Sequence, residues 1–166
     1  MSVILSIPVL AFLSILQSAV VSRLPLDQGV ADLMLVFLVA IALQKRVSTA
    51  WQWSIIGGML IDFLSGLPFG IFTISYLVAT ALETLFRERI WRFTFIMQLL
   101  VVLVGTLVSQ GLSYLVLFLQ GASLDLITVL RVIIMPTIIL NFMLSLPVFI
   151  LTRDILDQIY PQEQNA

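Results

Sequence analysis

Two aspartates lie inside apolar stretches of this sequence, where a carboxylate has few ordinary uses. Asp62 belongs to GGMLIDFLSGLPFG, residues 57–70, and Asp32 begins the run DLMLVFLVAIAL. A carboxylate among apolar groups is costly unless it is paired, hydrated or protonated. Two such groups held close together could form the dyad of an aspartyl hydrolase, in which like charges separate the pKa values. Each could instead serve the structure, as a helix cap or as one half of an ion pair.

Most other catalytic chemistries lack their side chains. The 166 residues include no cysteine and no histidine, which removes thiolate nucleophiles, structural zinc sites and imidazole catalysis. No Gly-x-Ser-x-Gly and no Gly-x-x-x-x-Gly-Lys motif occurs. The aspartyl reading is also weak, because the Asn-x-Gly-Ala-Ala-Phe motif of lipoprotein signal peptidase and the Gly-x-Gly-Asp motif of other membrane aspartyl proteases are missing. We therefore predict no enzyme activity, no metal and no cofactor.

The composition predicts a membrane protein. The chain is 61% hydrophobic and 10% charged, whereas soluble domains are about 45–50% apolar and ~25% charged. A net charge of −1 without a basic cluster argues against a nucleic-acid partner. A membrane helix needs about 20 apolar residues. We predict an all-α integral membrane protein, one domain over residues 1–166, with six transmembrane helices in one bundle at 3–22, 29–43, 50–67, 69–86, 93–119 and 126–152.

The distribution of basic residues predicts the orientation. With six spans, both termini share a side with the second and fourth loops and the tail, which hold Lys45, Arg46, Arg87, Arg89, Arg92 and Arg153. The other side has Arg23 and, just inside the sixth span, Arg131. The positive-inside rule then places both termini in the cytoplasm and residues 57–70 near the outer face.

The second span has no polar face, so we expect it to border lipid or a partner's helix. In the fifth span, Gly105, Ser109 and Ser113 form a small-residue stripe, which is typical of close helix packing and is also a plausible partner surface. Asp32 lies where the second span begins, and capping of that helix would explain it.

Several polar residues inside the spans favour a shared site. Asp62 and Arg131 each lie about five residues, or roughly 7–8 Å, below the outer end of their spans. We predict that they form an ion pair, directly or through water. Tyr76 and Asn141 lie on inward-facing polar stripes, so Asp62, Tyr76, Arg131 and Asn141 are also the candidates for lining a cavity.

A tight reversal is predicted directly after Asp62. Pro68 cannot continue a helix and disfavours the α conformation at Leu67. Gly66 and Gly70 supply the conformational freedom that the turn needs.

These residues resemble the signature of the rod shape-determining protein MreD family. The matching positions in GGMLIDFLSGLPFG are Gly58, Asp62, Ser65, Gly66, Pro68 and Gly70. ADLMLVFLVAIAL is similar to the family's second helix, usually written Pro-Asp-Leu-Leu, with Asp32 in place and Ala31 replacing the proline. MPTIILNFMLSLPVF is similar to the family's last helix, with Pro136 and Asn141 in place. The resemblance extends from about residue 29 to residue 151.

The resemblance implies a non-catalytic protein of the bacterial inner membrane that takes part in cell elongation. Its implied partners are MreC, RodA with a class B penicillin-binding transpeptidase, and, indirectly, MreB filaments. It also implies a fold similar to the substrate-binding subunits of energy-coupling-factor transporters. The alternative function is therefore a vitamin-type transporter subunit, in which Asp62, Tyr76, Arg131 and Asn141 would hold the ligand.

Overall fold

The described residues fold into six helical rods, which confirms the prediction of an all-α protein with six helices. The computed structural model describes residues 3–19, 27–44, 49–86, 94–123 and 125–159. The rods are α1 (Val3–Ala19), α2 (Leu33–Leu43), α3 (Ala50–Ser65), α4 (Ile71–Phe86), α5 (Thr94–Leu119), and a last rod in which α6 (Leu126–Val129), the π-helical turn η2 (Leu130–Ile134) and α7 (Met135–Ile159) follow without a break.

The rods differ in length. Residues 95–119 and 126–155 form two helices that are long and apolar enough to cross a membrane, while α1, α2 and α4 contain shorter apolar helices. The predicted spans and the helices agree within two residues at most ends. Three ends differ by more. The described part of α1 ends at Ala19, three residues before the predicted end, and α7 continues to Ile159, seven residues beyond it. α2 begins four residues later than predicted, because residues 29–32 are not helical.

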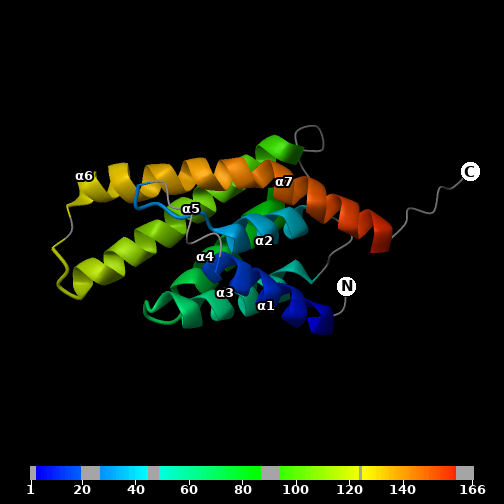
Figure 1. Cartoon of the computed structure of the whole chain (residues 1–166), viewed down its shortest axis with the longest axis horizontal. Coiled ribbons are helices and arrows are strands. Elements are labelled where there is room, and N and C mark those ends of the chain that lie inside the picture. Colours follow the sequence, from blue (N-terminus) through cyan, green and yellow to red (C-terminus); the bar gives the residue numbers. More distant parts are fainter. Residues whose placement is uncertain (1–2, 20–26, 45–48, 87–93, 124, 160–166) are drawn as a thin grey trace, which may run out of the picture.

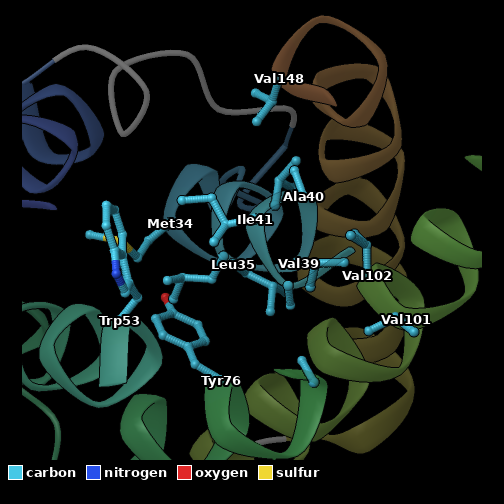
Figure 2. Close-up of a cluster of buried hydrophobic side chains, with 14 of the residues drawn as sticks. Met34, Leu35, Val39, Ala40, Ile41, Trp53, Tyr76, Val101, Val102 and Val148 are labelled. Carbon is cyan, nitrogen blue, oxygen red and sulfur yellow. The ribbon is translucent and has the colours of Figure 1, made fainter. Parts of the chain in front are cut away.

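The prediction that the second span borders lipid or a partner is wrong, because α2 is the central helix. It contacts α1, α3, α4, α5 and α7, and every α2 residue except Phe37 is buried. Figure 2 shows its side chains meeting Trp53 of α3, Tyr76 of α4 and Val148 of α7. A helix that is apolar all round can be a membrane span or a core helix, and the burial of α2 shows that it is in the core.

The small-residue stripe of α5 is used inside the bundle. A Cβ on Gly105 would lie 2.8 Å from Leu35 and 3.1 Å from Ala79, so this glycine lets α5 approach α2 and α4 closely. Ser109 is also buried. Packing, rather than a partner, accounts for this stripe.

The beginning of α1 and the end of α7 lie at the same end of the molecule, at the right of Figure 1. The α3–α4 turn and the α5–α6 connection lie toward the opposite end. Six of the basic residues behind the predicted orientation fall outside the described residues: Arg23, Lys45, Arg46, Arg87, Arg89 and Arg92.

Candidate functional site

Asp62 connects the end of α3 to the beginning of α4. Its side chain is buried, and its Oδ2 accepts from the backbone N–H of Gly70 at 3.0 Å and of Thr73 at 3.2 Å. Its Oδ1 accepts from the N–H of Phe72 at 2.9 Å, and the Thr73 hydroxyl donates to Oδ2 at 2.6 Å. The first N–H groups of a helix have no partner within the helix, and their dipoles favour a negative charge. Asp62 therefore caps α4 from the neighbouring helix.

The other residues of this motif build the turn around that cap. Gly66 ends α3 in the left-handed region at φ 68°, and Gly70 has φ 107°, conformations that favour glycine. The Ser65 hydroxyl donates to the Asp62 carbonyl and accepts from the Leu67 N–H. Pro68 is exposed in the turn itself.

Gly58 sets the distance between α3 and α4 one turn before Asp62. A Cβ added there would come closer than 3.0 Å to the Thr73 backbone, which is nearer than real Cβ atoms approach. The helices can touch at this level only because residue 58 is glycine. Gly58 thus holds Thr73 within reach of Asp62, and the motif forms one helix-joining device.

The predicted ion pair between Asp62 and Arg131 is wrong. The donors of α4 occupy both oxygens of the Asp62 carboxylate, and Arg131 is exposed on η2, which packs against α5, α6 and α7. In the described part of the chain, the ion pair found joins Arg153 and Asp154 on the surface of α7. The equal depth that we predicted for the two residues in their spans does not make them partners.

Asp32 forms a second, deeper cluster. It is the N-cap of α2, and its Oδ1 accepts from the Leu35 N–H at 2.9 Å, as the sequence predicts. The Tyr76 hydroxyl of α4 lies 2.8 Å from each of the two carboxylate oxygens. Asp32 is 8% exposed and Tyr76 is fully buried. The cap therefore also ties α2 to α4.

Asn141 connects Asp32 to α5 and α7. Its Oδ1 accepts from the backbone N–H of Asp32 at 2.6 Å, and its Nδ2 donates to the Thr106 hydroxyl at 2.8 Å. Asn141 is fully buried. The structure thus brings three predicted site residues together: Asp32, Tyr76 and Asn141.

A non-helical segment, residues 28–32, leads into α2, and its residues Gly29, Ala31 and Asp32 are buried. Buried backbone outside a helix needs hydrogen-bond partners from elsewhere. Gln17 of α1 supplies two of them, because its side-chain N–H donates to the Ala31 carbonyl at 2.9 Å and its oxygen accepts from the Leu33 N–H at 2.7 Å. We did not predict Gln17, although a side-chain amide within an apolar span is a signal that could have identified it.

The last rod supplies the remaining partners of this segment. In a regular α-helix the carbonyl of Val132 would accept from residue 136, but Pro136 has no N–H. The Gln28 N–H donates to that carbonyl at 3.2 Å, and the Val30 N–H donates to the Thr137 hydroxyl at 3.2 Å. Gly29 fits here because a Cβ would lie 2.7 Å from the Pro136 side chain. The π-helical turn therefore coincides with the docking site of the segment.

A cavity of about 210 Å³ lies beside Asp32 and Tyr76. It is lined by residues of α1, α3, α4, α5 and the non-helical segment 28–32. Ligand pockets typically measure about 300–1,000 Å³, so this one is small. Asp62, Arg131 and Asn141 are not among its lining residues. The two aspartates have separate donors and no hydrogen bond between them, which gives no support to a dyad. In the described ranges, no cluster of three or more acidic side chains could hold a metal.

One family model matches residues 1–158, and its description is rod shape-determining protein MreD. No curated protein and no solved structure matches the chain. The match covers the surroundings of Asp32 and of Asp62, the non-helical segment 28–32, and all of the described helices except the end of α7.

Proposed function

Because this chain belongs to the rod shape-determining protein MreD family, we propose that it is a non-catalytic membrane component of the bacterial cell-elongation complex. Family membership implies a role in determining rod cell shape and a place among membrane proteins. The match over residues 1–158 is the observation that carries the proposal.

The proposed location is the bacterial inner membrane, with six crossings and both termini in the cytoplasm. Two observations support an even number of crossings. The chain has six helical rods, and the beginning of α1 and the end of α7 lie at the same end of the molecule (Figure 1). Non-helical backbone buried in protein, such as Gly29, Ala31 and Asp32, would help the shorter rods to reach across the membrane.

We propose that the chain acts as an adaptor for MreC, and through it for RodA and its class B penicillin-binding transpeptidase, with MreB filaments contacted indirectly. The adaptor would hold a partner's membrane helix in register, so that the partner's extracytoplasmic domain is correctly presented. Neither α2 nor the Gly105 stripe is free for this contact, because both are used inside the bundle.

The outward face of α5 is the surface that we propose for the partner helix. Leu107 and Leu115 are 44% and 49% exposed on this face, and Gly111 lies between them. A Cβ on Gly111 would meet nothing within 4 Å. A small residue between exposed apolar ones lets another helix approach closely in the membrane.

Cysteine crosslinking tests this proposal directly, because the chain has no cysteine of its own. Single variants Leu107→Cys and Leu115→Cys would be paired with cysteines along the membrane segment of MreC in living cells. Met143→Cys, on the exposed face of α7, is the matched control. We expect crosslinks from α5 and few from Met143→Cys. Crosslinks from α7 alone would show that the interface lies on α7 and not on α5. The absence of crosslinks from both helices would contradict the adaptor role.

Cell shape gives a second readout. In cells that depend on this chain, Gly111→Leu would fill the space that the partner helix needs, while Gly111→Ala adds only one methyl group. We expect round cells with Gly111→Leu and rods with Gly111→Ala, at equal protein levels. Rods with both variants would remove this face from the interface.

The transporter alternative receives less support. It requires Asp62, Tyr76, Arg131 and Asn141 to surround one ligand, but only Tyr76 lines the cavity. Asp62 and Asn141 are occupied in holding helices together, and Arg131 is exposed. The adaptor proposal does not require these four side chains to lie around one site.

A further inference from the structure

The cavity beside Asp32 combines a carboxylate with a mostly apolar wall, and the adaptor role uses neither. Its volume of about 210 Å³ equals that of roughly seven water molecules, at about 30 Å³ each. Much of its wall is apolar or aromatic, including Ile61, Leu64, Phe72 and the ring of Tyr76. The charged group in the wall, among the described residues, is the carboxylate of Asp32.

That carboxylate has acceptor capacity to spare. An ionised carboxylate offers about four lone-pair sites. Two donors use it here, since Oδ1 accepts from the Leu35 N–H and one Tyr76 hydroxyl is shared between the two oxygens. No ion pair to Asp32 is found in the described part of the chain. A buried carboxylate without a cation is costly, so a cation that enters the cavity gains from meeting it.

We propose that this cavity binds the primary ammonium group of a small amphiphilic amine. An ammonium group carries three N–H donors and a positive charge, which match the free acceptor sites of Asp32. Phe72 and Tyr76, whose ring centroids are 6.0 Å apart, also line the cavity, and aromatic rings attract cations. Ile61 and Leu64 provide apolar contacts for a short carbon chain. An anionic ligand would be repelled by Asp32.

Two sources could supply this group, a free amine or the ethanolamine headgroup of a membrane phospholipid. Leu64 and Ser65, in the last turn of α3, and Ser18, near the end of α1, belong to the wall. The cavity therefore lies toward the end of the bundle where these helices end, within reach of headgroups. The inference rests on the cavity and Asp32, so it does not depend on the adaptor role.

The first test uses the unaltered chain. Binding of propylammonium and of 1-propanol, which is similar in size and neutral, would be measured by titration calorimetry on protein purified in a zwitterionic detergent. We expect the amine to bind at least about tenfold more tightly, as hydrogen bonds to charged groups imply. Equal affinities, or no binding of the amine, would overturn the proposal without the need for any variant.

The second test uses a matched pair of aspartate variants. Asp32→Asn removes the charge, but the amide oxygen can still cap α2, since asparagine and aspartate are comparable N-caps. Asp125→Asn makes the same change at the exposed N-cap of α6, where Asp125 accepts from the Thr128 N–H. We expect Asp32→Asn to weaken propylammonium binding at least about tenfold and Asp125→Asn to leave it unchanged. Unchanged binding by a folded Asp32→Asn protein would place the amine elsewhere.

Lipid nanodiscs distinguish the two sources. One preparation would contain phosphatidylethanolamine, and the other phosphatidylcholine, whose headgroup has no N–H donor. Weaker propylammonium binding in the first preparation than in the second identifies the phospholipid headgroup as an occupant. Equal, Asp32-dependent binding in both identifies a free amine. No Asp32-dependent binding in either preparation contradicts the site.

Discussion

The hydroxyl of Tyr76 lies 2.8 Å from both carboxylate oxygens of Asp32, 44 residues earlier in the chain. The contact joins the N-terminus of the central helix to the middle of α4, away from bulk solvent. Hydrogen bonds to charged groups are worth about 1.5–3 kcal/mol. The contact therefore contributes to holding α2 against α4.

Replacing Tyr76 by phenylalanine should lower the free energy of unfolding by about 1.5–3 kcal/mol, because Asp32 loses its side-chain donor. Thermal unfolding in detergent would measure the change. Asp32→Asn and the double variant complete a double-mutant cycle. Residues in one hydrogen-bond network couple by about 0.5–3 kcal/mol, and a cycle with no coupling would contradict the contact.

Gly58→Ala should destabilise the protein by about 1–3 kcal/mol, because its Cβ would press against the Thr73 backbone. Gly111→Ala is the control, since a Cβ there meets nothing within 4 Å. Alanine is favoured over glycine in a helix by about 1 kcal/mol, so this control should be neutral or slightly stabilising. Equal effects of the two changes would show that α3 and α4 are not in close contact at Gly58.

Asp62→Ala should destabilise by about 2–3 kcal/mol, because three N–H groups at the beginning of α4 lose their acceptor. Asp62→Asn keeps one acceptor oxygen and should cost less. Arg131→Ala should change stability by no more than about 0.5 kcal/mol, as exposed positions do. The charge-swap variant, Asp62→Arg with Arg131→Asp, should be no more stable than Asp62→Arg alone. A clear gain in stability would show that the two residues form an ion pair, which would contradict the structure.

Asn141→Leu should lower stability by about 1–3 kcal/mol, because the backbone N–H of Asp32 is left buried without an acceptor. Ser145→Ala, one turn further along α7, is its control. The Ser145 hydroxyl donates only to the Asn141 carbonyl within the same helix, so its loss should cost less than about 1 kcal/mol. Hydrogen exchange at the beginning of α2 should increase in Asn141→Leu and remain unchanged in Ser145→Ala.

The sequence predicts the parts of this fold that depend on local signals. Apolar length predicts the helices. Pro68 with Gly66 and Gly70 predicts the turn after α3, where both glycines have positive φ. The capping role of Asp32 follows from its position before an apolar run. The central position of α2 was not predicted, because the absence of a polar face is equally expected of a helix in the core and of a helix against lipid.

The long-range partners could not be predicted in the same way. Asp62 and Arg131 matched in depth and charge, but depth does not fix which helices are neighbours. Asn141 was expected to line a cavity, whereas it accepts from the backbone N–H of Asp32, which precedes the first turn of α2 and has no partner within that helix. The non-helical segment 28–32 takes its hydrogen-bond partners from Gln17, Val132 and Thr137, which lie far apart in the sequence.

The docking of residues 28–32 also sets an order of assembly during synthesis. The Val30 N–H has its partner 107 residues later, and the Asp32 N–H has its partner 109 residues later. A ribosome must therefore produce almost the whole protein before the central helix can acquire its final neighbours. Contacts this distant in sequence slow folding and leave incomplete states exposed. A chain truncated before residue 130 would lack the closing element, and the quality-control proteases of the membrane would meet an open bundle.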